Sequence, residues 1–150
     1  MMSLIELAIA KALEAHTGQR DKAGAPYILH PLRVMLSGKT DAERIVGVLH
    51  DVLEDGPDYH VGDLAFLPAD LVEAVVALTR RPGEDYMAFC RRAGANPVAR
   101  RVKIADLRDN LSPDRQLPIS AETEERLARY RAALAMLEAI ENGTLKERIS

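Results

Sequence analysis

Residues 42–55 read AERIVGVLHDVLED, and this stretch indicates the fold class. Its apolar residues recur at the three- and four-residue spacing of one helix face. These residues are Ile45, Val48, Leu49 and Val52. Asp41 precedes them as a candidate N-cap, and Gly56 with Pro57 stops the pattern. The spacing therefore predicts one amphipathic helix that runs without interruption to Asp55.

Helical spacing also governs the segments on either side. Ser3, Asn96 and Ser120 stand where helix N-caps are expected, and Pro97 fits a first helical turn. The segments with this pattern are residues 4–17, a short helix from His30, a turn at 63–67, and residues 69–80, 86–94, 97–111 and 120–142. Apolar residues nowhere alternate for the length of a strand. We therefore predict an all-α fold, a compact bundle of about six to eight helices.

Composition narrows the class of protein. The chain has 150 residues, and we expect a single domain over residues 1–150. A net charge of −3 does not indicate the basic surface that binds duplex nucleic acid, although a few local cations can still neutralise a nucleotide's phosphates.

Cysteine content and hydropathy indicate the compartment. Cys90 is the only cysteine, which favours a reducing compartment, and no apolar run could cross a bilayer. We expect a cytoplasmic protein without nucleic-acid or membrane partners, and the sequence does not indicate an oligomeric state.

Four polar side chains interrupt the 42–55 helix near its end. His50 and Asp51 are adjacent, and Glu54 and Asp55 follow each of them by four residues, which places two acidic groups over the first pair on one side of the helix. Clustered carboxylates repel one another unless a cation lies among them. A divalent metal ion would remove that conflict. The alternative is that these residues are ordinary solvated groups at a helix end.

A second polar set lies on the 97–111 helix. Lys103, Asp106 and Asn110 share one face, so an ammonium, a carboxylate and an amide could enter one cleft. The alternative is a solvated polar stripe, but Asp106 stands in the most apolar part of the helix, which favours a buried and compensated carboxylate. Tyr86 and Phe89, three residues apart, are expected to pack in the core.

Three motifs together carry a resemblance to a known family. They are PYILHP at 26–31, HDVLED at 50–55 and KIADLRDN at 103–110. In this order and spacing, the chain from about residue 6 to 115 resembles the HD-domain superfamily of metal-dependent phosphohydrolases. More narrowly, it resembles the RelA/SpoT-type (p)ppGpp hydrolase domain and its stand-alone small alarmone hydrolase relatives.

The resemblance implies a role for individual residues. The family's metal ligands fall on His30, His50, Asp51 and Asp106, and its two catalytic acids fall on Glu54 and Asp55. Positions that contact substrate fall on Lys22, Tyr27 and Asn110, with Lys103 and Arg20 as further candidates to hold phosphate charge.

One loop departs from the family pattern. The family places an arginine directly before the lysine, whereas this chain reads Arg20-Asp21-Lys22. An acid therefore stands where a basic residue of the nucleotide pocket is expected. The departure bears on the substrate more than on metal-dependent hydrolysis, because every metal and acid position is filled.

The resemblance implies a metal-dependent enzyme that removes the 3′-pyrophosphate of (p)ppGpp and leaves GDP or GTP. Two imidazoles and two carboxylates suit Mn²⁺, Fe²⁺ or Zn²⁺, and the resemblance favours Mn²⁺. Two alternatives remain at this point. One is a phosphohydrolase of another nucleotide, and the other is a non-catalytic helical binding module that keeps the metal as a structural element.

Overall fold

A computed structural model describes residues 1–115 and 119–145 of the chain. These residues form eight α-helices and one short 3₁₀-helix, and the described part contains no strand, so the predicted all-α class is confirmed. The elements are α1 (Leu4–His16), α2 (Leu29–Ser37), α3 (Asp41–Leu49), α4 (Val52–Asp55), η1 (Val61–Leu64), α5 (Ala69–Ala77), α6 (Tyr86–Gly94), α7 (Pro97–Asn110) and α8 (Ala121–Glu141).

Local side-chain chemistry sets most helix starts. The Ser3 hydroxyl accepts from the backbone N–H of Glu6, whose carboxylate in turn accepts from the Ser3 N–H, which completes a capping box. The predicted caps Asn96 and Ser120 each accept a hydrogen bond from the third residue of their helix. The cap of α3 is Thr40, not Asp41 as predicted, because the extended backbone of Thr40 lets its hydroxyl accept from the N–H of Glu43.

The predicted continuous helix over 42–55 is wrong. It divides into α3 and α4 at His50 and Asp51, where Asp51 has φ −107° and ψ 0°. The His50 ring explains the break, since its Nδ1 lies 2.7 Å from the carbonyl oxygen of Gly47. A continuous helix would pair that oxygen with the Asp51 N–H.

Helix α5 is shorter than expected and ends at Ala77 instead of Arg80. The hydroxyl of Thr79 donates to the carbonyl of Val75, and Pro82 disfavours a helical conformation at Arg81. The chain therefore leaves the helix before the Arg80 side chain, which becomes free to reach the pocket described below.

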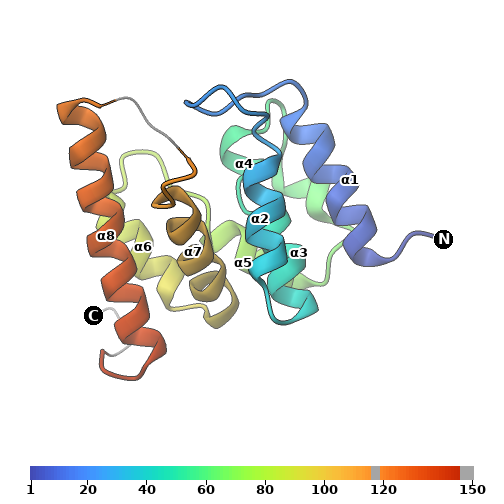
Figure 1. Ribbon diagram of the computed structural model, residues 1–150. Coiled ribbons are helices and arrows are strands. Elements are labelled where there is room, and N and C mark those ends of the chain that lie inside the picture. The colour runs from blue at the N-terminus through green and yellow to red at the C-terminus, as the bar shows by residue number, and fades with distance from the viewer. Residues whose placement is uncertain (116–118, 146–150) are drawn as a thin grey trace.

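Two apolar clusters meet on α7. The first gathers α1, α2, α3, α4, η1 and α5 with Ala93 of α6 and with Ala99 and Val102 of α7. The second gathers the rest of α6 and α8 with Ile104 and Leu107 of α7. Figure 1 shows α6, α7 and α8 on one side of the molecule and α1, α2 and α3 on the other. Gly47 lets α3 approach α2 closely, because a Cβ there would lie 3.3 Å from the Met35 backbone. Within the described residues, no helix is long and apolar enough to span a membrane.

Candidate metal centre and pocket

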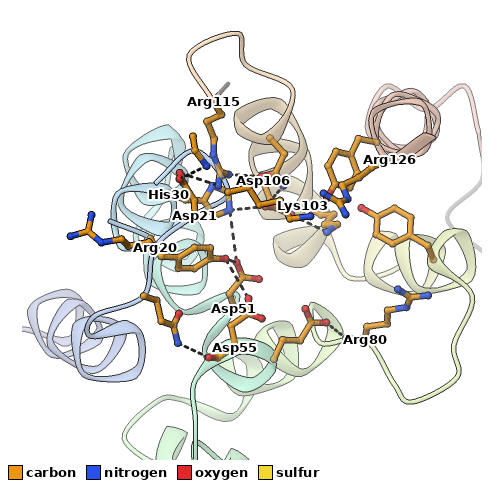
Figure 2. Close-up of a pocket in the computed structure, with 18 of the residues that line it drawn as sticks. Arg20, Asp21, His30, Asp51, Asp55, Arg80, Lys103, Asp106, Arg115 and Arg126 are labelled. Atoms are coloured by element: carbon orange, nitrogen blue, oxygen red, sulfur yellow. Dashed lines mark hydrogen bonds and ion pairs between the residues drawn. The ribbon is translucent and has the colours of Figure 1, made fainter. Parts of the chain in front are cut away.

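Four polar side chains from separate elements converge between the two clusters. His30 comes from α2, Asp51 from the α3–α4 break and Asp106 from α7 (Figure 2). His50 comes from the same break as Asp51. Nε2 of His30 lies 2.9 Å from Oδ1 of Asp106 and 3.8 Å from Oδ2 of Asp51. Nε2 of His50 lies 3.1 Å from Oδ2 of Asp51 and 3.3 Å from Oδ1 of Asp106. The structure thus brings together all four residues that the sequence predicts as metal ligands.

Each imidazole is held in place through Nδ1, the ring nitrogen that does not face Asp51 and Asp106. Nδ1 of His50 faces the carbonyl oxygen of Gly47, which only accepts, so this nitrogen carries the proton. In the neutral ring, the buried Nε2 of His50 directs a lone pair at carboxylate oxygens, and it makes no hydrogen bond within the described chain. Nδ1 of His30 lies 2.6 Å from Oδ2 of Asp109. Lone pairs that face carboxylates at these distances repel unless a proton or a metal ion lies between them.

The donor atoms fit a divalent cation. They form two adjoining groups: one is His30, His50 and Asp106, and the other is Asp51, Glu54 and Asp55. In each group, the donor atoms all lie within 4.8 Å of one another. Burial alone would raise the pKa of Asp106, yet Lys103 and the histidines outweigh it and hold this pKa well below its usual range. Burial would lower the pKa of His50, but Asp51 and Asp106 raise it well above its usual value. The cluster therefore attracts positive charge, and imidazole and carboxylate ligands suit a transition-metal dication.

Glu54 and Asp55 lie beside the cluster on α4. Oε1 of Glu54 accepts from the backbone N–H of Arg80 at 2.5 Å. The Tyr27 hydroxyl donates to Asp51 and lies 3.4 Å from Oδ2 of Asp55. Partial burial is the largest effect on both acids and raises the pKa of each. A carboxylate with a raised pKa is a better base toward water than an ordinary one.

Lys103 is buried against Asp106 instead of extending toward solvent. Its Nζ lies 2.8 Å from Oδ2 of Asp106 and within 5.5 Å of the ring centres of Tyr86 and Phe89. Burial would lower the pKa of Lys103, but Asp106 raises it above the usual range. The two rings pack together, as expected from their spacing, and they also face the ammonium. Lys103 thus lines the pocket with its charge already paired.

These groups open into a pocket of about 630 Å³. It is lined by Gln19, Arg20, Asp21, Lys22, Ala23, Tyr27, His30, Asp51, Glu54, Asp55, Arg80, Tyr86, Phe89, Lys103, Asp106, Asn110, Arg115, Arg126 and Tyr130. Every residue predicted for the site lines this pocket except His50, which is 2% exposed. The lining combines acids with arginines, lysines and aromatic rings, so the pocket suits an anionic ligand with an aromatic part.

The loop before Tyr27 gives Asp21 a structural role. Its Oδ1 accepts from the backbone N–H groups of Ala23 and Ala25, which fixes the turn, and its Oδ2 lies 3.6 Å from Arg115. Arg20 donates to the carbonyl of Gly24 in the same turn. The unexpected acid thus orders the loop and brings an arginine from another part of the chain into the pocket.

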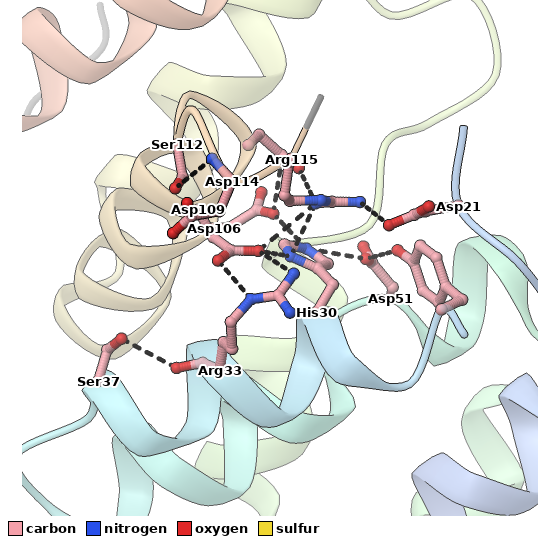
Figure 3. A network of polar contacts seen from close by, with 12 residues as sticks. Asp21, His30, Arg33, Ser37, Asp51, Asp106, Asp109, Ser112, Asp114 and Arg115 are labelled. Atoms are coloured by element: carbon pink, nitrogen blue, oxygen red, sulfur yellow. Dashed lines mark hydrogen bonds and ion pairs between the residues drawn. The ribbon is translucent and has the colours of Figure 1, made fainter. Parts of the chain in front are cut away.

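Sequence reasoning missed several residues of the site. Asp109 faces His30 and Arg33, and Arg115 reaches the same place from the loop after α7 (Figure 3). The amide of Asn110 donates to Asp106 at 3.1 Å and accepts from Arg115 at 2.5 Å, so it ties these residues together. Asp109 stands three residues after Asp106 on one helix, a spacing that could have found it. The positions of Arg33 and Arg115 depend on tertiary contacts.

The chain has relatives among known proteins. No family model matches the chain. It is 33% identical over 144 residues to the "Probable guanosine-3′,5′-bis(diphosphate) 3′-pyrophosphohydrolase" of Synechocystis, an alignment that covers 81% of this chain and 19% of that protein. It is 31% identical over 135 residues to the bifunctional (p)ppGpp synthase/hydrolase SpoT of Escherichia coli K12, which covers 76% of this chain and 19% of SpoT. The chain is therefore related to RelA/SpoT-type proteins, and it spans about a fifth of the length of these curated relatives.

A solved structure supports the fold. The chain superposes on a metazoan ortholog of SpoT, described as hydrolysing ppGpp, with a TM-score of 0.73 and 20% sequence identity. The match covers 91% of this chain and 86% of that one. The chain therefore shares its fold with that structure.

Proposed function

We propose that this protein is a metal-dependent phosphohydrolase that removes the 3′-pyrophosphate of (p)ppGpp, with Mn²⁺ as its metal. The observation that carries the proposal is the convergence of His30, His50, Asp51 and Asp106 beside two acids of raised pKa. The relatives named as (p)ppGpp pyrophosphohydrolases support the substrate.

The two histidines and two aspartates would hold the cation through His Nε2 atoms and carboxylate oxygens. When bound, a divalent ion lowers the pKa of a coordinated water and offsets phosphate charge, which makes attack on phosphorus feasible near neutral pH. Tyr27 keeps Asp51 in place through its hydroxyl, and the other three ligands, His30, His50 and Asp106, are buried.

Glu54 and Asp55 would orient the attacking water and take its proton. The Arg80 N–H fixes one oxygen of Glu54, so the carboxylate has a defined direction at the pocket edge. Water attacks the phosphorus attached to the ribose 3′ oxygen, the bond between these two atoms breaks, and the 3′ oxygen leaves with a proton. The products are pyrophosphate and GDP or GTP.

Basic side chains of the pocket would bind the phosphates. Arg20 and Lys22 come from the loop before α2, and Arg80 and Arg126 approach from the opposite side. Lys103 would act indirectly, since its ammonium neutralises Asp106. A second candidate function is hydrolysis of another nucleotide, and the observation that favours it is Asp21, which replaces an expected arginine with an acid that orders the loop.

The test is turnover by metal-stripped protein with and without Mn²⁺. Protein, ppGpp and a panel of other nucleotides are incubated, and release of pyrophosphate and phosphate is followed for the wild type, Asp51→Ala and Asp41→Ala. Asp41 is a matched control, because it is 84% exposed at the far end of α3. We expect Mn²⁺-dependent pyrophosphate release from ppGpp that only Asp51→Ala abolishes. Turnover restricted to other nucleotides would favour the second candidate, and no turnover at all would contradict both.

A further inference from the structure

We propose that Asp109 is a positioning residue for the metal site, which fixes His30 in the orientation and tautomer that present its Nε2 to the cation. The proposal rests on the metal site of the proposed function. It concerns a residue outside the set of ligands, acting through one of them.

The contact between the two side chains is short and enclosed. Nδ1 of His30 lies 2.6 Å from Oδ2 of Asp109, and the two side chains are 3% and 13% exposed. An ionised carboxylate only accepts hydrogen bonds, so Nδ1 must carry the proton. In the neutral ring the lone pair is then on Nε2, on the side of Asp106 and Asp51.

Arg33 holds the Asp109 carboxylate in place. Its Nε donates to Oδ1 at 2.7 Å and its Nη2 donates to Oδ2 at 3.1 Å, so the salt bridge is bidentate. His30 and Arg33 lie one turn apart on α2 and both reach Asp109 on α7, so the three side chains join the two helices beside the site (Figure 3).

A contact with Arg115 would favour the other tautomer of His30. Nη1 of Arg115 lies 3.0 Å from Nδ1 of His30, and a guanidinium only donates. If this contact prevailed, Nδ1 would accept, the proton would move to Nε2, and His30 could not bind a metal. Asp109 is nearer to Nδ1, and Arg115 has other acceptors in Asn110 and Asp21. The geometry therefore favours the tautomer set by Asp109.

The second histidine provides an internal comparison. His50 has its Nδ1 fixed by the carbonyl of Gly47, a backbone group that no substitution removes. Only His30 depends on a side chain for its orientation. Outer partners of metal-bound histidines contribute roughly 10- to 100-fold to metal affinity, so loss of Asp109 should be measurable.

The experiment is a titration of metal-stripped protein with Mn²⁺, in which the paramagnetic resonance signal of free Mn²⁺ reports binding. We expect Asp109→Ala to weaken affinity roughly 10- to 100-fold, and Asp109→Asn to weaken it less than about tenfold because an acceptor oxygen remains. Arg115→Ala should not weaken it. Arg108→Ala is the matched control, since Arg108 also joins α7 to another helix, through Glu138 at 2.8 Å, away from the site.

A second measurement separates positioning from a purely structural role. Thermal unfolding of each metal-free variant gives its folded fraction, and nitrogen shifts of His30 in protein loaded with diamagnetic Zn²⁺ give its tautomer. We expect Nδ1 to carry the proton in the wild type. A folded Asp109→Ala variant that binds Mn²⁺ like the wild type, or a proton on Nε2, would overturn the proposal.

Metal binding by the variants distinguishes the metal site itself from the role of Asp109. If the wild type binds neither ion, the metal site of the proposed function is wrong and the role of Asp109 with it. If the wild type binds Mn²⁺, Asp51→Ala does not, and Asp109→Ala binds normally, then the metal site stands and only the role of Asp109 is refuted.

Discussion

Lys103→Met should destabilise the metal-free protein, and a divalent cation should restore part of the loss. The methionine keeps the packing of the lysine stem against Tyr86 and Phe89 but removes the ammonium 2.8 Å from Oδ2 of Asp106. A carboxylate that is 4% exposed then loses its nearest positive charge.

The magnitude follows from the remaining partners of Asp106. Breaking a buried ion pair from one side costs about 3 to 5 kcal/mol. Asp106 still accepts from the amide of Asn110 at 3.1 Å, so we expect the lower end, about 3 kcal/mol. At about 2 to 4 °C per kcal/mol for a chain of this size, Tm should fall by roughly 6 to 12 °C. Removing a nearby like charge should also tighten Mn²⁺ binding about tenfold, which returns ~1.4 kcal/mol at saturation.

The assay is urea and thermal unfolding in a chelator and again in saturating Mn²⁺. Arg101→Met is the control, because Arg101 lies on the same helix, is 44% exposed and pairs with Glu141 at 3.0 Å, so its loss should cost less than about 1 kcal/mol. A loss for Lys103→Met below about 1 kcal/mol in chelator, or a loss that Mn²⁺ leaves unchanged, would refute the view that Asp106 is a buried charge in need of a cation.

Three further changes have defined outcomes. Burial raises the pKa of Glu54 above its ordinary value of 4.5, and a base must be deprotonated to act. As the solution is acidified, kcat/KM should therefore fall with a midpoint above pH 4.5. Glu54→Gln, assayed across the same pH range, should remove most activity at every pH. Gly94→Ala should lower stability by about 1 to 3 kcal/mol in urea unfolding, because its Cβ would lie 2.8 Å from Leu137, whereas Gly62→Ala meets nothing within 4 Å and should cost far less. Leu49→Ala should cost about 2 to 5 kcal/mol in the same assay, since the side chain is 0% exposed, and a smaller loss would mean that the first apolar cluster contributes less than its burial indicates.

The sequence predicted what depends on local pattern. Apolar spacing and the caps Ser3, Asn96 and Ser120 predicted the helices, and four polar residues within reach of one another in the fold were recognised by their motifs. The choice of Thr40 over Asp41 as a cap was not predictable, because both residue types cap well and only the backbone conformation decides.

What the sequence did not predict depends on contacts between distant segments. The break at His50 arises from a ring-to-backbone hydrogen bond that apolar spacing does not reveal. Asp109 pairs with α2 across 76 or more residues of sequence, and Arg115 meets His30 across 85. Such pairs are set by how α2 and α7 pack, and no periodicity within either helix specifies them.

The meeting of two apolar clusters on α7 has a consequence for how the protein opens. The proposed metal ligands lie on elements of the first cluster and on α7, whereas Arg126 and Tyr130 of the pocket belong to α8, which packs mainly against α6 and α7. Sub-global unfolding of α8 would remove that wall while the ligands stay together. Amide hydrogen exchange should therefore be faster in α8 than in α3, and a bound nucleotide should slow it more than the cation alone. The pocket would then consist of one wall that is ordered beforehand and one whose ordering is part of the free energy of binding.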